Sequence, residues 1–240
     1  MGLISLLFSN PGMFLVLAVL LLYSVIAHEV AHGWVANLFG DDTAKHYGRL
    51  TLNPASHIDP VGLLMLFIVG FGWAKPVPVN YYKLGNSRLA LMSVSLAGCA
   101  ANILIAIIAL FLLQFTEVSA SPAFSTPLTI LVRINIILGA LNLIPIPPLD
   151  GSKILMSLLP QQAQQNLARL EPYGFFILAL LLFTGALDPV IRFMQNLIYS
   201  FITLLFSFFG LRADRHARLE WCTLPDEVRN LFRLNPNSRI

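Results

Sequence analysis

A histidine–glutamate–histidine motif inside a long apolar stretch constrains this chain more than any other feature. His28, Glu29 and His32 lie within residues 11–39, where Glu29 is the only residue with a formal charge. If this stretch is helical, the two histidines lie about one turn apart on one face, so both imidazoles can bind the same metal ion. Glu29 is then placed to take a proton from a water molecule that the metal activates.

The alternative is a pair of core histidines beside a buried glutamate. We do not favour it, because ionisable side chains at the depth of a bilayer are energetically costly and indicate function by default. The composition supports a membrane setting. The chain has 240 residues, of which 57% are hydrophobic and 11% charged, whereas soluble domains carry about 25% charged residues. We therefore expect an all-α polytopic membrane protein without nucleic-acid binding, whose arginine-rich C-terminal tail suits lipid headgroups.

The lengths of the apolar stretches predict about five transmembrane helices, at residues 11–39, 89–115, 127–149, 172–187 and 189–211. The last two are expected to form a helical hairpin. Polar loops are expected at residues 43–60, 116–126 and 150–171. Another apolar stretch, residues 61–74, is shorter than the ~20 residues that a crossing helix needs. It predicts a short re-entrant or β-hairpin membrane segment that packs against protein. Prolines at positions 76 and 78 make the next residues, 75–80, extended.

The distribution of basic residues predicts the orientation in the membrane. Thirteen of the 15 Lys and Arg residues fall within residues 43–88, 150–171 and 212–240, and none falls within residues 1–10 or 116–126. The other two, Arg133 and Arg192, lie near the outer ends of their spans and can snorkel outward. This split predicts a multi-pass protein of the cell (inner) membrane with its N-terminus outside and its C-terminus in the cytoplasm, provided that the short segment does not cross.

A second unusual segment runs from Asn142 to Gly151. Asp150 follows directly after a span that is expected to break at Pro145, Pro147 and Pro148, so its carboxylate can point into a cavity. The predicted orientation brings Asp150 to the same side of the membrane as the two histidines. Two histidines and one carboxylate leave a fourth zinc position for water, as in catalytic zinc sites. The alternative is that Asp150 only caps the segment that follows it.

Together, the two motifs resemble those of the site-2 protease family of intramembrane zinc metalloproteases. The matching residues are His28, Glu29 and His32 in the first motif and Asn142, Pro145, Pro147, Asp150 and Gly151 in the second. Residues 53–60 and 72–78 also look like the compact bacterial branch of that family. The resemblance covers about residues 11–155. Cys99 stands where many relatives have proline, whereas Gly98 and Asn102 are kept. The chain length leaves no room for the PDZ or CBS domain of some relatives.

The resemblance implies a zinc metalloendopeptidase that cleaves peptide bonds within or near the transmembrane segments of membrane-protein or signal-peptide substrates. It implies one Zn²⁺ per chain on His28, His32 and Asp150, with Glu29 as the general base. The candidate donors for the oxyanion are Asn142 and Asn102, although interhelical hydrogen bonding is an equal alternative. We expect residues 1–211 to form the transmembrane metalloprotease domain and residues 212–240 to form a cytoplasmic basic tail.

Two lesser features remain open at this level. His57 beside Asp59 could be an alternative metal ligand or could bind and orient a ligand, but a turn-stabilising role is favoured. Residues 76–81 could pair with an unwound substrate strand or serve as a plain lid or edge strand.

Two rival functions also remain, namely an intramembrane metal transporter and a non-catalytic membrane scaffold. The ionisable residues form one cluster instead of a path across the bilayer, which argues against transport. Glu29 is present, which argues against a scaffold.

Overall fold

The computed structural model describes residues 3–69, 74–84 and 87–211. Within these ranges the regular structure is entirely helical, without a strand, which confirms an all-α polytopic membrane protein. Four helices are long and apolar enough to cross a membrane: α2 (Pro11–Leu38), α5 (Arg88–Leu112), α7 (Pro122–Asn142) and α11 (Asp188–Phe208). The basic tail, residues 212–240, lies outside the described residues.

Among the described residues, a fifth crossing exists only if two bent helices are counted as one span. Helix α9 (Gln161–Ala168) and helix α10 (Glu171–Phe183) pass the same test as a pair, with a bend of 62° between them. Helix α10 alone has 13 residues and rises about 20 Å, which is short of the ~30 Å hydrocarbon core. Residues 172–183 thus lie in the second half of the bent pair that supplies a fifth span, in agreement with the expected number of about five.

Two expected loops are helical instead. Residues 116–126 contain helix α6 (Thr116–Ala120) and the start of α7, which runs through Pro127. A proline near the start of a membrane helix removes one backbone bond, which its surroundings can tolerate. Residues 150–171 contain helix α8 (Asp150–Leu158) and helix α9. Their glutamines, two serines and one lysine are typical of a loop, but glutamine and lysine are good helix formers.

The short apolar segment is helical where it is described. Helix α4 (Pro60–Val69) has ten residues and rises about 15 Å, half the thickness of the hydrocarbon core. A β-hairpin is therefore wrong for residues 60–69, whereas residues 70–73, which include Trp73, lie outside the described residues. Residues 74–80 have no regular secondary structure, in agreement with the effect expected from Pro76 and Pro78. We call them the 74–80 segment.

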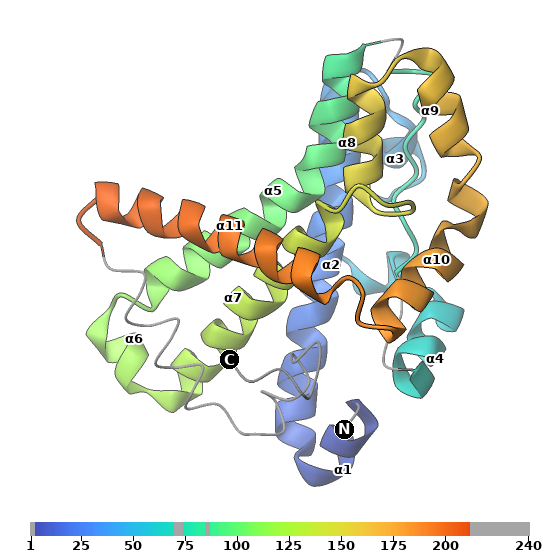
Figure 1. The fold of residues 1–240 in the computed structure, drawn as a ribbon. Coiled ribbons are helices and arrows are strands. Elements are labelled where there is room, and N and C mark those ends of the chain that lie inside the picture. The colour runs from blue at the N-terminus through green and yellow to red at the C-terminus, as the bar shows by residue number, and fades with distance from the viewer. Residues whose placement is uncertain (1–2, 70–73, 85–86, 212–240) are drawn as a thin grey trace.

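Helix α5 lies at the centre of the molecule and packs against α2, α7 and α8, while α11 crosses α7 (Figure 1). Small residues on α5 are buried at these contacts, among them Ala97, Gly98, Ala106 and Ala109. Small side chains allow helix backbones to approach closely in a membrane. Three short helical elements complete the described structure: α1 (Leu3–Ser9), α3 (Thr43–His46) and the 3₁₀ turn η1 (Pro54–Ser56).

Candidate metal centre

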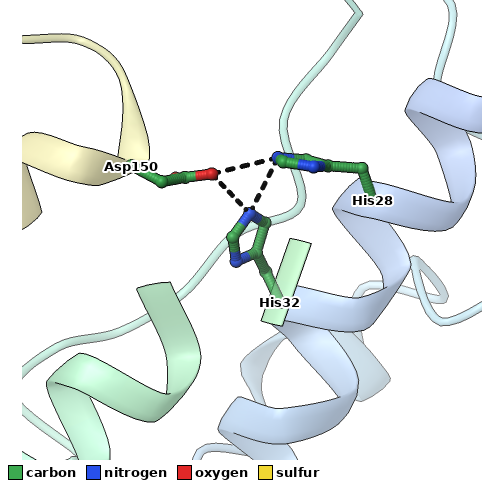
Figure 2. Close-up of side chains that lie close together, drawn as sticks. All are labelled: His28, His32 and Asp150. Atoms are coloured by element: carbon green, nitrogen blue, oxygen red, sulfur yellow. Dashed lines mark hydrogen bonds and ion pairs between the residues drawn. The ribbon is translucent and has the colours of Figure 1, made fainter. Parts of the chain in front are cut away.

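The three predicted ligands lie together, although they come from α2 and from the start of α8. Asp150 Oδ2 is 3.0 Å from His28 Nε2 and 3.0 Å from His32 Nε2, and the two histidine nitrogens are 3.1 Å apart (Figure 2). All three side chains are buried. Their ligand atoms lie within 4.8 Å of one another, which is a grouping that could hold a metal ion.

The hydrogen bonds of the two imidazoles show which ring nitrogen carries the hydrogen. His32 Nδ1 lies 2.7 Å from the carbonyl oxygen of Val94, and His28 Nδ1 lies 2.7 Å from Asn102 Oδ1. Both oxygens can only accept, so both Nδ1 atoms donate, and a neutral ring then has an unprotonated Nε2. Two Nε2 lone pairs and a carboxylate oxygen therefore face one another. Such a set of acceptors fits a cation, and two nitrogens with one oxygen suit zinc.

A chain of buried amides holds the ring of His28. Asn102 Nδ2 donates to Asn135 Oδ1 at 3.0 Å, and Asn135 Nδ2 donates to Ser24 Oγ at 2.9 Å. These contacts join α2, α5 and α7, so Asn102 makes the interhelical bonds that were its alternative role. Sequence reasoning missed Asn135, which could have been noticed as one of two amides in an apolar span. Asn142 Nδ2 donates to Leu138 O within α7 at 3.0 Å.

Helix α5 passes so close to the histidines that only glycine fits at position 98. A Cβ atom added to Gly98 would lie 2.6 Å from His28 Nε2 and closer still to His32 Nε2, whereas ordinary carbon contacts are about 3.5–4.0 Å. Gly98 therefore leaves the space in which the two ligand nitrogens meet.

Asp150 does not act as a helix cap. Asp150 is the first residue of α8, and Leu149 occupies the N-cap position. Leu149 makes no side-chain capping bond. The carboxylate instead turns towards the histidines, so the capping alternative does not hold.

The second carboxylate oxygen of Asp150, Oδ1, lies 3.8 Å from Lys153 Nζ. Lys153 also stands over the ring of Tyr81, at 5.8 Å from the ring centroid. Burial lowers the pKa of Lys153, but Tyr81 and Asp150 outweigh it and raise this pKa above its ordinary value. The lysine therefore stays charged at neutral pH, beside the oxygen of Asp150 that faces away from the histidines.

Glu29 lies outside the cluster of ligand atoms. Its Oε2 accepts a hydrogen bond from the backbone N–H of Val77, in the 74–80 segment, at 2.9 Å. An ionised carboxylate has about four acceptor positions, so this single bond leaves capacity for a water molecule.

His57 has the turn-stabilising role that was favoured for it. His57 is fully buried, and its Nε2 donates to Thr51 O at 2.8 Å, which stabilises the turn before α4. His57 is not part of the group that could hold a metal. His46 is exposed, and His216 lies outside the described residues.

Comparisons with known proteins link this geometry to zinc proteases. The model of peptidase family M50 matches residues 114–185. The chain is 41% identical over 198 residues to "Putative zinc metalloprotease YwhC" of Bacillus subtilis, covering 80% of this chain and 90% of that protein. It is 34% identical over 197 residues to Rip2 of Mycolicibacterium smegmatis, described in the same terms, covering 80% and 75%.

A more distant relative is "Zinc metalloprotease MJ0392" of Methanocaldococcus jannaschii. It is 29% identical over 156 residues, which cover 64% of this chain and 37% of that protein. No solved structure matches the chain significantly.

Proposed function

The chain belongs to peptidase family M50 as a membrane zinc metalloprotease, and from this premise we propose that it cleaves peptide bonds within or near the transmembrane segments of substrate proteins. The family assignment confirms the resemblance drawn from the two motifs. The substrates that we propose are membrane proteins and signal peptides. The observation that carries the proposal is that the candidate metal centre includes two residues of α2, a 28-residue apolar helix.

We assign the zinc ligands as His28 Nε2, His32 Nε2 and Asp150 Oδ2, with one ion per chain. When bound, zinc supplies the Lewis-acid activation that makes water nucleophilic near neutral pH and polarises a carbonyl. The Glu29 carboxylate accepts the proton of the attacking water and then passes it to the leaving amine. Val94 O and Asn102 Oδ1 fix the two histidine rings through their Nδ1 atoms, which is how ligand histidines are usually oriented.

Asn142 and Asn102 remain our candidates for stabilising the oxyanion. Each side-chain amide has two N–H groups, and each makes one donated bond that is described above. A second N–H is therefore left on each amide, but Asn102 is fully buried whereas Asn142 is partly exposed, so Asn142 is the more accessible to a substrate carbonyl. Asn142 is the better placed by sequence, because it ends α7 directly before the turn that leads to Asp150.

Reconstitution separates this function from its two rivals. Purified protein in liposomes with a single-span model substrate should yield two fragments, identified by mass spectrometry. Removing zinc with a chelator should stop cleavage, and adding zinc should restore it. Zinc flux into the liposomes without cleavage would identify a transporter, and neither flux nor cleavage would indicate a scaffold.

We further propose an orientation, with the N-terminus outside and residues 212–240 as a tail in the cytoplasm behind a metalloprotease domain at residues 1–211. Support comes from the placement of the basic residues. In a Cys222→Ser background, we expect Lys83→Cys to react with a membrane-impermeant maleimide only from the cytoplasmic side, and Ser119→Cys only from the outside. Labelling of both from the same side would contradict the orientation.

A further inference from the structure

We propose that Arg49 is a positioning residue for Glu29, and that it acts through the peptide unit between Pro76 and Val77. This inference rests on the proposed function, because it explains how the general base of that site is held. Neither the two sequence motifs nor the spacing of the metal ligands indicates this role of Arg49.

A hydrogen bond joins the 74–80 segment to Glu29. The N–H of Val77 donates to Glu29 Oε2 at 2.9 Å, across 48 residues of sequence. Val77 stands between Pro76 and Pro78, and proline has no backbone N–H. Val77 is therefore the one residue of this three-residue run that can donate to the carboxylate.

Arg49 binds the other side of the same peptide unit. Arg49 Nη2 donates to the carbonyl oxygen of Pro76 at 3.1 Å and to that of Lys75 at 2.7 Å. The carbonyl of Pro76 and the N–H of Val77 belong to one planar trans unit, in which C=O and N–H point in opposite directions. Arg49 thus fixes the oxygen end of the plane, and Glu29 binds its hydrogen end.

The buried state of Arg49 points to a specific task. Its residue exposure is 8%, and among the described residues its hydrogen bonds go to these two carbonyls and to no carboxylate. Burying a cation costs desolvation free energy, and only well-placed hydrogen-bond partners offset part of this cost. Through Nη2 the guanidinium is therefore placed to orient these two peptide units.

Other contacts attach the segment itself, so Arg49 is not needed to keep it in place. Lys75 N donates to His57 O at 2.8 Å, and Asn80 N donates to Asp41 Oδ2 at 2.6 Å. The side chain of Val77 packs on α2 at Gly33, where an added Cβ would lie only 2.7 Å from Val77 Cγ1. Loss of Arg49 should therefore free the rotation of one peptide plane without detaching the segment.

The test compares kcat, KM and zinc content in the reconstituted cleavage assay. For Arg49→Gln we expect kcat to fall about 10–100-fold, the usual cost of losing an orienting partner, with one zinc per chain and KM within about twofold of wild type. Arg49→Lys, which retains a cationic donor, should recover most of the lost kcat. Lys45→Gln, which changes an exposed basic residue of the neighbouring helix α3, is the matched control.

Proline at position 77 removes the N–H itself. Val77→Pro should lose kcat to a similar extent as Arg49→Gln, and the double variant should be no slower than Val77→Pro alone, because both changes remove one interaction. Val79→Pro controls for the introduction of a ring into the segment. A double variant that loses the product of the two single effects would overturn the proposal.

Failure of the inference can be told apart from failure of the proposed function. Wild-type protein that binds zinc but cleaves nothing contradicts the function. Active wild type with unchanged kcat in Arg49→Gln contradicts only the inference, as does a loss that Arg49→Lys fails to rescue. If Arg49→Gln does not fold, the Val77 pair decides: equal kcat in Val77→Pro and Val79→Pro overturns the proposal.

Discussion

Replacing Glu29 with glutamine is expected to lower proteolysis by at least about 10²–10⁴-fold, the usual contribution of general base catalysis, while zinc content stays at that of wild type. The physical reason is that glutamine keeps the size of the side chain and can still accept the N–H of Val77, but cannot take up a proton near neutral pH. Glu29 also lies outside the group of ligand atoms, so its loss should not release the metal.

The measurement is single-turnover cleavage of a transmembrane substrate, with zinc determined on the same preparation. Glu29→Asp is an informative comparison, because it retains a carboxylate that is shortened by one methylene and should lose less activity than Glu29→Gln. Near wild-type cleavage by zinc-loaded Glu29→Gln would show that Glu29 is not the base.

Removing a ligand should lower zinc content from about one ion per chain to near zero. His28→Ala, His32→Ala and Asp150→Ala each leave two of the three protein ligands, whereas catalytic zinc sites have three. Activity should be lost as well, so these variants resemble Glu29→Gln in a cleavage assay and differ from it in metal content. Elemental analysis of the purified proteins makes the distinction.

An exposed histidine gives the matched control for this comparison. His46→Ala removes an imidazole that lies outside the candidate metal centre, so it should keep full zinc content. Full zinc retention in Asp150→Ala would remove Asp150 from the ligand set and leave its contacts with the two histidines as a structural feature only.

The parts of the site that follow from local geometry could be predicted from the sequence. The spacing of His28 and His32 fixes their common face on any helix. The prolines predicted a break before Asp150, and α7 ends at Asn142, three residues before the first of them. Asp150 could be placed on the same side of the membrane as the histidines because the spans at residues 11–39 and 127–149 were expected to run in the same direction.

Other parts depend on how distant segments approach one another, and the sequence has no local signal for them. The contact of Arg49 with the carbonyls of Lys75 and Pro76 joins residues 26 and 27 positions apart, and the bond between Asn102 and Asn135 joins two apolar spans. Helices α8 and α9 were missed for a different reason: their polar residues resemble those of a loop, and only their packing and helix propensity decide the outcome.

The central claim is that His28, His32 and Asp150 bind one zinc ion, and zinc-edge X-ray absorption of the purified protein tests it most directly. We predict a coordination shell of nitrogen and oxygen only, with the scattering pattern of two imidazoles, and loss of the bound zinc in Asp150→Ala. A sulfur ligand would contradict this assignment, and the buried Cys99, which follows Gly98 in the sequence, is a residue that could supply one. A spectrum without imidazole scattering would contradict it as well.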